Sequence, residues 1–357
     1  MTSLLYVGPL PPAPGGIAQH GANLVRGLRE CGARVAAISW ASQYPKLLYP
    51  GSRRSPDGDV FPGAQDRLRW WDPTGWHHVG RLARSADAIV VPWVTPVQFG
   101  PVGTLLRAAE PALRVVVAHN PLPHEPGPLD LPLSRWALAP ADLALVHAHH
   151  IVGDLERLSP GIEVVVSPHP PNLPIQPHPL PDPQPLRLLF MGYVRPYKGL
   201  DLAIDAVQLL RRQGRDVVLT VAGEFWEPVS RWREYVRARG LEQHIELRAG
   251  YVPDSQLEGL LADHHLVVAP YRSATQSGIV PLALAAGRPV VVTDVGGLRE
   301  AVRDGANGVV VPPDDVVALA AGVERGELLL GHALRGTATW ASVGQAVLDG
   351  MAALRWR

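Results

Sequence analysis

The chain holds 357 residues, of which 46% are apolar, and its 33 basic side chains balance 33 acidic ones. That length exceeds one ordinary hydrophobic core and fits two domains, and the balanced charge excludes a global attraction to nucleic acid. A single cysteine, Cys31, excludes an intrachain disulfide framework and favours the cytoplasm as the compartment.

The chain opens with a short apolar run over residues 1–7, which is followed by Gly-Pro. We expect this run to form the first strand of a sheet, and we expect no signal peptide. No uninterrupted apolar run in the sequence approaches the ~20 residues that a membrane span needs. The sequence therefore predicts no membrane-spanning helix.

In the first half of the chain, short β-branched runs alternate with stretches of helical period. Near-continuous apolar runs of this kind are typical of parallel strands buried on both faces. Strands are predicted at residues 3–7, 34–38, 88–91, 114–118, 143–146 and 164–166, with helices at 17–30, 103–109 and 151–158. We expect a Rossmann-like domain over residues 1–170.

Residues 168–185 break this alternation with closely spaced prolines. Such a segment forms neither a helix nor a central strand, so we predict a semi-rigid linker over residues 171–185. The alternation then resumes, with strands predicted at 187–191, 216–222, 245–248, 266–269, 289–293 and 309–311 and a helix at 200–212. This indicates a second Rossmann-like domain over 186–338, and a last helical segment, 339–357, that packs back toward the first domain.

The predicted fold is therefore α/β, with two doubly wound domains that face each other across a cleft. In sheets of this kind, ligands bind at the carboxyl ends of the strands. The loops at those ends are where candidate functional residues are expected.

In the first domain, Gly15 and Gly16 stand in a Pro/Gly loop before the first helix. They would let backbone amides approach a ligand, although an ordinary loop explains them equally well. The loop lacks the Gly-x-Gly-x-x-Gly spacing of a dinucleotide site, which disfavours a nicotinamide enzyme.

The loop after the strand at 114–118 carries His119, His124 and Glu125 between prolines. A histidine and a carboxylate on a stiff loop can bind hydroxyl groups or exchange protons. A lone strand-end histidine is more often structural, but three polar residues together favour function.

A second histidine group comprises His147, His149 and His150. Metal binding is conceivable, but no cysteine or carboxylate set completes a site, so we prefer a turn at a strand end.

The most informative segment is 190–201, where a buried strand leads into a glycine turn, Arg195, Lys198 and a helix. Two cations beside a helix N-terminus are typical of phosphate binding, arginine through its planar fork and lysine as a point charge. Gly192 and Gly199 favour this interpretation over ordinary surface cations.

Residues 275–278 form a second loop with the features of a phosphate-binding site, again between a predicted strand and a predicted helix. Thr275, Gln276, Ser277 and Gly278 supply two hydroxyls, an amide and free backbone N–H groups, more than a plain N-cap needs. Two such loops predict a ligand that carries a diphosphate.

A further turn at residues 296–297 precedes Glu300, which we place at a helix start as a surface acid that compensates the helix dipole.

With these motifs in view, the chain resembles the retaining glycosyltransferases of family 4, the glycosyl transferases group 1 with the GT-B fold. The resemblance is strongest over residues 186–313. It rests on Gly192-x-x-Arg195-x-x-Lys198-Gly199, on Gly-Tyr-Val-Pro-Asp at 250–254, and on the stretches 266–270, 287–293 and 294–300. The glycine pair at 15–16 and His119 also match family positions.

The resemblance implies that Arg195 and Lys198 hold the diphosphate of a UDP- or GDP-sugar and that Val252 meets the nucleobase. It further implies that residues 275–278 and the glycine pair approach the phosphates, and that His119 lies near the donor sugar. No metal or other cofactor is implied, because two cations and a helix dipole neutralise the diphosphate. The implied reaction transfers a hexose with retention of anomeric configuration.

One departure from the family pattern stands out. The family usually carries two glutamates eight positions apart, and those positions hold Ala274 and Leu282 here. The roles of those acids therefore do not carry over. The departure motivates one alternative, a catalytically weak relative that binds a nucleotide sugar or a partner protein.

A second alternative is a sugar-nucleotide epimerase or hydrolase of the same fold, for which Glu125 and Glu300 are the candidate acids. For the transferase, the acceptor stays open among a glycan, a lipid-linked and a small-molecule acceptor. We expect acceptor contacts in loops 39–54 and 61–76, the second of which carries Trp70, Trp71 and Trp76. Those aromatics leave peripheral association with the inner face of the membrane open, although a patch buried under a long loop is preferred.

Overall fold

The computed structural model of the chain describes residues 1–13, 15–44, 60–122, 127–332, 334 and 338–355. The chain divides into two units. The first comprises Met1–Asn172 together with Ala338–Arg357, and the second comprises Leu173–Thr337. The proline-rich stretch from 173 onward thus belongs to the second unit, and the C-terminal segment to the first.

The first unit is built on a sheet with strand order β3-β2-β1-β4-β5-β6-β7, in which each pair of neighbours runs parallel. The strands are β1 (Ser3–Val7), β2 (Arg34–Ser42), β3 (Ala64–Arg69), β4 (Ala88–Trp93), β5 (Leu113–Ala118), β6 (Leu143–Val146) and β7 (Glu163–Val166). The helices are α1 (Gly16–Glu30), α2 (Pro73–Leu82), α3 (Phe99–Ala109), α4 (Asp130–Leu138), α5 (Val152–Leu158) and α12 (Trp340–Arg355), with short 3₁₀ turns η1 (Ala83–Ser85), η2 (Pro96–Gln98) and η3 (His149–Ile151).

Alternation along β1 shows why this sheet is buried on both faces. Leu5 and Val7 belong to an apolar cluster with α2, α3, α4 and α5, whereas Leu4 and Tyr6 belong to a cluster with α1 and α12. Successive side chains of a strand point to opposite faces, so one apolar run supplies both cores.

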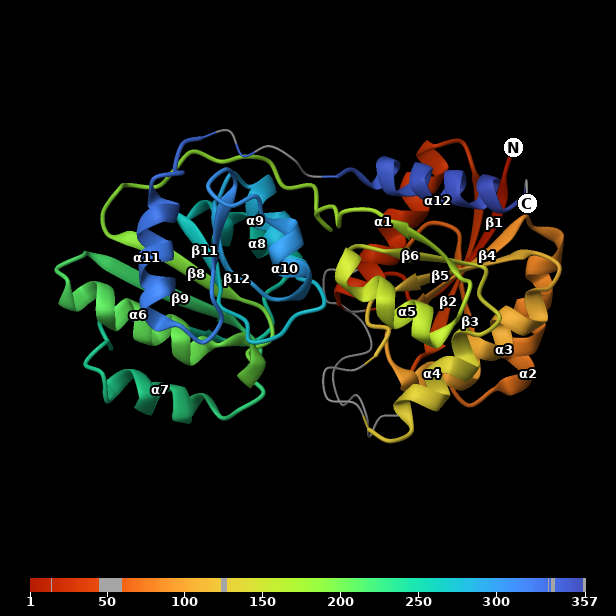
Figure 1. Cartoon of the computed structure of the whole chain (residues 1–357), viewed down its shortest axis with the longest axis horizontal. Helices are drawn as coiled ribbons and strands as arrows, with labels where there is room; N and C mark the ends of the chain where they lie inside the picture. The colour runs from red at the N-terminus through yellow and green to blue at the C-terminus, as the bar shows by residue number, and fades with distance from the viewer. Residues whose placement is uncertain (14, 45–59, 123–126, 333, 335–337, 356–357) are drawn as a thin grey trace. The chain divides into compact units, whose positions relative to one another are not determined.

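The C-terminal helix α12 packs against α1, and Figure 1 shows the two helices side by side. Their backbones meet at glycines: a Cβ atom added to Gly27 would lie 2.1 Å from the carbonyl oxygen of Trp340, and one added to Gly344 would lie 2.8 Å from the carbonyl carbon of Gly27. The absence of side chains at these positions lets the helices approach closely.

The second unit repeats the architecture with strand order β10-β9-β8-β11-β12-β13, again with parallel neighbours. The strands are β8 (Leu186–Met191), β9 (Val217–Gly223), β10 (Ile245–Ala249), β11 (Leu266–Ala269), β12 (Val290–Thr293) and β13 (Gly308–Val311). The helices are η4 (Pro196–Lys198), α6 (Leu200–Arg212), α7 (Val229–Arg237), α8 (Asp254–Ala262), α9 (Ile279–Ala285), α10 (Gly296–Ala301) and α11 (Val316–Glu327). Helices α6, α7 and α11 cover one face, and α8, α9 and α10 cover the other.

The predicted fold class, two parallel α/β domains of the Rossmann-like kind, is therefore confirmed. One region differs: residues 61–76 do not form a loop but contain β3 and the start of α2. Only Leu68 of β3 is buried, so this strand lacks the apolar run by which the others were recognised. The other expected loop, 39–54, begins inside β2, and most of it lies outside the described residues.

The tryptophans of that region are divided between surface and core. Trp70 and Trp71 are 37% and 53% exposed and meet edge to face with ring centroids 5.5 Å apart. Trp76 packs against the core, and its indole N–H donates a hydrogen bond of 2.7 Å to the carbonyl of Arg69. In the part of the chain that the structure describes, no helix combines the length and the apolar character required to cross a bilayer.

We expect Gly27→Ala to lower the free energy of unfolding by about 1–3 kcal/mol, because the new methyl group would collide with the backbone of α12. The control is Gly153→Ala on α5, where an added Cβ meets no atom within 4 Å. Urea unfolding of both variants measures the difference. A Gly27→Ala protein as stable as the control would contradict the close approach of the two helices.

Candidate functional site

The connection from β8 to α6 depends on glycines that let backbones touch. Gly199 has a φ of 66°, and a Cβ added there would lie 2.1 Å from the carbonyl oxygen of Pro270, which follows β11. A Cβ added to Gly223 at the end of β9 would lie 1.9 Å from the carbonyl oxygen of Gly192. The turn that carries Arg195 and Lys198 therefore packs between the carboxyl ends of β9 and β11.

Lys198 points its ammonium group between β8 and β11. Its Nζ lies 4.9 Å from the ring centroid of Tyr271 and 3.2 Å from where a Cβ of Gly192 would stand. Strand order reverses between β8 and β11, because the chain first extends the sheet through β9 and β10 and then returns to the other side of β8. Such a switch point is where doubly wound sheets bind ligands.

Arg195 lies at the other side of the same turn. Its guanidinium carbon stands 3.6 Å from the ring centroid of Trp226, which is 62% exposed. Among the described residues, neither Arg195 nor Lys198 lies within 4.0 Å of a carboxylate oxygen. Two half-buried cations without an acidic partner are suited to binding an anionic group.

Arg272 differs from Arg195 and Lys198, because its guanidinium group is hydrogen-bonded to carboxylates and to a backbone carbonyl. It donates hydrogen bonds of 2.9 and 2.6 Å to the two carboxylate oxygens of Asp201, one of 2.7 Å to Asp314, and one of 3.0 Å to the carbonyl of Pro196. Although partial burial opposes ionisation of Asp201, the bonds from Arg272 hold the pKa of that carboxyl below its usual value. Arg272 therefore fixes η4 and the start of α6, a role that the sequence analysis missed.

The second predicted phosphate-binding loop, residues 275–278, lies between β11 and α9. Thr275 is buried, and the Nε2 donor of Gln276 is enclosed without a hydrogen-bond partner among the described residues. Gly278 caps α9, which begins at Ile279, as expected for Ser277 and Gly278 at a helix start. An enclosed amide donor without a partner would be satisfied by an acceptor atom of a ligand.

The two positions at which the resemblance expects glutamates lie in the apolar core. Ala274 and Leu282 are 8% and 5% exposed and belong to the cluster on the α9 face of the second sheet. These positions therefore offer no polar group, and any polar contact from this segment comes from residues 275–278.

Val252 lies in the connection from β10 to α8, half-buried against the core. It lines a pocket of about 430 Å³ together with Ala222, Gly250, Gln256 and Asp263. Because Ala222 and Gly250 stand at the carboxyl ends of β9 and β10, this pocket opens at the same sheet edge as Arg195 and Lys198.

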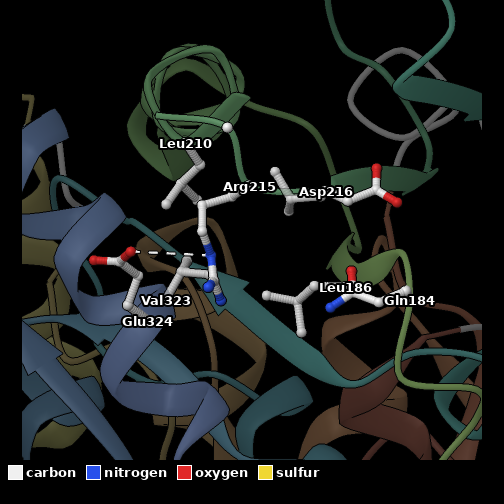
Figure 2. Close-up of a pocket in the computed structure, with 9 residues that line it drawn as sticks. Gln184, Leu186, Leu210, Arg215, Asp216, Val323 and Glu324 are labelled. Carbon is white, nitrogen blue, oxygen red and sulfur yellow. Dashed lines mark ion pairs between the residues drawn. The ribbon is translucent and has the colours of Figure 1, made fainter. Parts of the chain in front are cut away.

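Another pocket of the second unit lies at the opposite edge of the sheet (Figure 2). Its volume is about 300 Å³, and it is lined by Leu186 at the start of β8 and by Asp216 and Val217 at the start of β9. Arg215 reaches across it toward Glu324 at 4.0 Å. None of the predicted site residues lines it.

The prediction for Glu300 was wrong in one respect. Helix α10 begins at Gly296, so Glu300 lies in its last turn rather than at its start, and a carboxylate there does not compensate the positive end of the dipole. Glu300 is exposed. His124 and Glu125 lie outside the described residues.

In the first unit, the glycine pair stands at the start of α1. Gly15 is the N-cap with a φ of 97°, a conformation that favours glycine, and a Cβ added to it meets no atom within 4 Å. A Cβ added to Gly16 would meet only the side chain of Asn172, at 3.8 Å. The backbone here is open, as an approach by a ligand requires.

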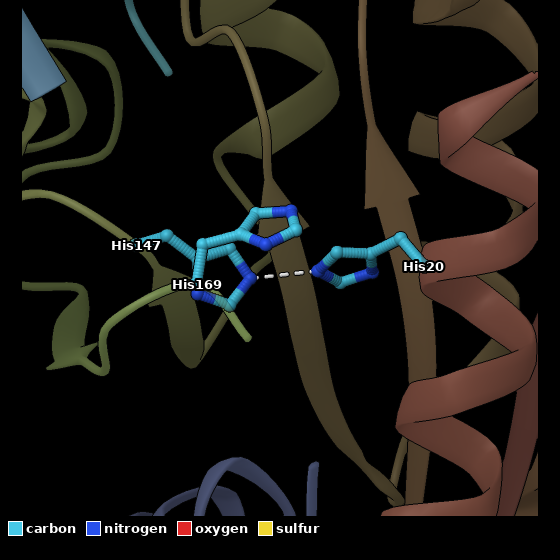
Figure 3. Close-up of side chains that lie close together, drawn as sticks. All are labelled: His20, His147 and His169. Atoms are coloured by element: carbon cyan, nitrogen blue, oxygen red, sulfur yellow. Dashed lines mark hydrogen bonds between the residues drawn. The ribbon is translucent and has the colours of Figure 1, made fainter. Parts of the chain in front are cut away.

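His119 follows β5 and joins three other histidines that come from separate elements. His20 lies on α1, His147 follows β6, and His169 lies in the segment after β7. The ring centroid of His20 is 4.5 Å from that of His119, 4.9 Å from that of His147 and 5.4 Å from that of His169. Figure 3 shows His20 and His147 facing each other with His169 beside them.

His147, His149 and His150, which are close together in the sequence, lie in different surroundings in the structure. His147 is buried in the cluster, whereas His149 and His150 are exposed and begin η3. The predicted turn at this strand end is present, but His147 takes its partners from elsewhere. His20 and His169 were missed, and the only signal for His20 was a polar residue on the buried face of a helix.

Burial keeps these imidazoles neutral. Desolvation lowers the pKa of His119 to about 3 and that of His169 to about 4. The same cause lowers the pKa values of His20 and His147 well below the ordinary histidine value, and the neighbouring histidines add to the effect. The carboxyl edge of the first sheet thus presents neutral imidazoles, whereas that of the second presents cations.

Comparison with known proteins gives a family match for part of the chain. Residues 185–326 match the family described as glycosyl transferases group 1, a segment that begins just before β8 and ends within α11. The match covers the predicted site residues of the second unit, from Gly192 to Glu300, and leaves the first unit, with Gly15, Gly16 and His119, outside it.

Among curated proteins, the chain is 28% identical over 324 residues to the phosphatidyl-myo-inositol mannosyltransferase of Mycobacterium leprae, covering 86% of this chain and 82% of that protein. It is 29% identical over 138 residues to the α-D-kanosaminyltransferase of Streptomyces kanamyceticus and 36% identical over 143 residues to the glycogen synthase of Mycobacterium tuberculosis. Each of these two matches covers 39% of this chain, and they span only 35% and 33% of the respective relatives.

Among solved structures, Anabaena Alr3699/HepE in complex with UDP and glucose superposes with a TM-score of 0.73 at 16% identity, over 99% of this chain and 100% of that one. Sucrose-phosphate synthase of Thermosynechococcus elongatus gives a TM-score of 0.70 at 16% identity, over 99% and 95%. At this identity the likeness concerns the fold, which is of the GT-B type.

We expect the free energy of unfolding to fall as the pH is lowered from 7 to 5 in metal-free buffer. His119 and His169 take up protons only near pH 3 and pH 4 when folded, but near the ordinary value of about 6.5 when unfolded. The unfolded chain therefore binds more protons in this window, which costs on the order of 1–2 kcal/mol of stability per histidine.

Urea unfolding at pH 7, 6 and 5 measures this dependence. The variant His119→Asn should lose less stability across the window than the wild-type chain, because one titrating group is gone. Equal pH dependence in the two proteins would show that His119 is not buried in neutral form.

Proposed function

We propose that this chain is a glycosyltransferase that moves a hexose from a nucleoside diphosphate sugar to an acceptor hydroxyl, with retention of anomeric configuration. The observation that carries the proposal is the pair Arg195 and Lys198 at the switch point of the second sheet, two cations without an acidic partner among the described residues. The glycosyl transferases group 1 match over residues 185–326 and the transferases among the relatives support it.

In the proposed reaction, Arg195 and Lys198 bind the diphosphate and stabilise the charge that grows on it as the bond to the anomeric carbon breaks. Lysine acts as a point charge between β8 and β11, and arginine, held against Trp226, offers its planar fork. The acceptor oxygen bonds to the anomeric carbon on the face that the diphosphate leaves. The departing diphosphate takes the acceptor's proton, so atoms and charge balance.

The donor's other contacts are assigned by position. The pocket beside Val252 is the proposed nucleobase site, because it opens at the edge that carries the cations. Thr275, Gln276 and Ser277 are the proposed polar contacts to the phosphates or the sugar, since Ala274 and Leu282 are apolar and buried. We propose that no metal ion is needed for the diphosphate.

The acceptor is proposed only by class, as a glycan, a lipid-linked or a small-molecule hydroxyl compound. The names of the relatives span phosphatidyl-myo-inositol, kanosamine and glycogen chemistry, so they do not narrow the choice. The donor base likewise stays between uridine and guanosine, although the HepE structure contains UDP. A cytoplasmic site of action is part of this proposal, with or without contact to the membrane surface.

Two observations favour a second candidate, a protein that binds a nucleotide sugar but transfers it weakly. The core positions of Ala274 and Leu282 hold no carboxylate, and Glu300 does not stand at the helix start expected for it. Binding of donor without turnover would favour this candidate over the transferase.

We expect one of UDP, GDP and their sugars to bind saturably to the wild-type chain, with equal affinity with and without magnesium. Lys198→Ala should lower transfer or donor turnover by about 10²–10³-fold, because the charge on the leaving diphosphate loses a stabilising partner. Arg195→Ala should weaken nucleotide binding. Calorimetry and a coupled assay for released nucleoside diphosphate measure the two effects.

The matched control for these substitutions is Arg212→Ala, which removes an exposed cation at the far end of α6. It should leave both binding and turnover near wild type. Lys198→Ala should alter the free energy of unfolding by less than about 1 kcal/mol. Wild-type turnover by Lys198→Ala would refute the assignment of this site.

We expect His119→Ala to slow transfer more than it weakens nucleotide binding, since the histidine is proposed to act near the sugar rather than at the diphosphate. Turnover at saturating donor and the dissociation constant of the free nucleotide separate the two effects. Equal losses in both, together with a lower melting temperature, would identify His119 as a structural residue.

A further inference from the structure

Three of the clustered histidines bring ring nitrogens together in a way that the proposed transfer reaction does not use. His20, His147 and His169 each offer one nitrogen, and these atoms all lie within 4.8 Å of one another. The three residues come from α1, from the end of β6 and from the segment after β7, so the fold rather than the local sequence brings them together.

Backbone carbonyls orient two of the three rings. The Nδ1 atom of His147 lies 2.7 Å from the carbonyl oxygen of Ser167, and the Nδ1 atom of His169 lies 2.5 Å from that of Pro170. A carbonyl can only accept, so each Nδ1 carries the proton and donates it. Each Nε2 atom is then left with a free lone pair. Histidine ligands to metal ions typically donate their other ring N–H to a backbone carbonyl or carboxylate in this way.

The protonation of His20 follows from its contact with His147. The Nε2 atoms of His20 and His147 are 2.7 Å apart. Because His147 Nε2 has no proton, His20 Nε2 must donate one in this pair. An ion that replaced this hydrogen bond would require the proton of His20 to move to its Nδ1 atom, with no net change of charge on the protein.

The distances require only small adjustments. A tetrahedral ion with metal–nitrogen bonds of about 2.0–2.1 Å separates its ligand nitrogens by about 3.3 Å. The His20–His147 pair would open by roughly half an ångström from 2.7 Å, and the other nitrogens, within 4.8 Å, would close by up to about 1.5 Å. Binding of an ion would require changes in the side-chain torsion angles that supply movements of this size.

The residues around the histidine cluster shield most of the imidazole rings from water, and this burial favours their neutral form. His20 and His147 are 2% and 8% exposed, and the ring of Trp340 from α12 stands edge-on to His20 at 4.8 Å between centroids. The indole N–H of Trp340 donates a hydrogen bond of 2.9 Å to the carbonyl of Pro171, which fixes this wall. His169 as a whole residue is half-buried. Neutral imidazole is the form that binds metal ions.

A fourth imidazole, that of His119, lies against this group. His119 is 7% exposed, and its Nε2 atom is buried without a hydrogen-bond partner among the described residues. Its ring centroid lies 4.5 Å from that of His20. A buried polar nitrogen without a partner costs stability, which indicates that this group of rings is built for a further occupant.

We propose that His20, His147 and His169 form a binding site for a divalent transition-metal ion of the Zn²⁺ type, in the first unit and separate from the diphosphate site. Imidazole nitrogens suit zinc, copper, nickel and cobalt, whereas magnesium and calcium prefer oxygen ligands. Three protein ligands leave the fourth position of a tetrahedral ion to water, to an anion or to His119. The proposal does not depend on the proposed transferase activity.

The test uses the full chain without an affinity tag, freed of metal with EDTA and dialysed. Titration with ZnCl₂ should show one tight site per chain, and CoCl₂ should give the visible absorption of a nitrogen-ligated cobalt ion. His20→Asn and His147→Asn should weaken this site at least about tenfold, in line with the loss of one ligand. The melting temperature of the wild-type chain should rise by about 3 °C or more with excess zinc.

The matched control is the double variant His149→Asn/His150→Asn, which removes two exposed histidines from η3 and should keep the tight site. MgCl₂ should produce neither binding nor a thermal shift. If the buried variants do not fold in EDTA, His169→Asn replaces them, because that side chain is half-buried. No tight zinc site in the wild-type chain, or one that survives His20→Asn or His169→Asn, would overturn the proposal.

Discussion

In both sheets, each strand runs parallel to its neighbours, so every strand-to-helix connection leaves its sheet at the same edge. This constraint gathers loops from distant parts of the sequence. The connections after β8, β9, β10 and β11 meet at one edge of the second sheet, and those after β5, β6 and β7 meet at one edge of the first. The polar groups of interest lie at these edges because the two faces of each sheet are occupied by apolar side chains.

At the edge of the second sheet, close backbone contact sets the position of charge. Gly199 and Gly223 allow neighbouring carbonyls to approach where any side chain would collide. Arg272 holds η4 through the carbonyl of Pro196, and its ion pairs with Asp201 and Asp314 neutralise its own charge. The cations of Arg195 and Lys198 rest instead on aromatic rings, which position a cation without neutralising it. One arginine thus stabilises the turn, and two other cations stay available.

The two edges have opposite electrostatic character for a physical reason. Arg195 and Lys198 are half-buried basic residues that keep contact with water, and they suit an anionic ligand. The histidines of the first sheet are largely buried, and desolvation removes their charge. A neutral imidazole binds a cation or a hydroxyl group rather than a phosphate. A donor diphosphate and a metal ion would therefore be recognised by different units of the same chain.

The sequence by itself was sufficient for much of the fold and for one part of the candidate site. Buried parallel strands are continuous apolar runs, which made β1, β6 and β11 recognisable to the residue, whereas β3, with only Leu68 buried, carried no such signal. The turn with Arg195 and Lys198 was recognisable because glycines, cations and helix start are adjacent in the chain. The helix that contains Glu300 was placed wrongly, since a pair of glycines does not by itself show where a short helix begins.

Only the tertiary structure decided which histidines meet. His20 and His147 are 127 positions apart, and neither has a local motif that identifies its partner. The neighbours of His147 in sequence, His149 and His150, are exposed, because a short turn after a strand sends successive side chains in different directions. Contacts between adjacent residues follow from local chemistry, but contacts across a sheet edge depend on strand order. Strand order results from the packing of the whole domain and cannot be read from any single segment.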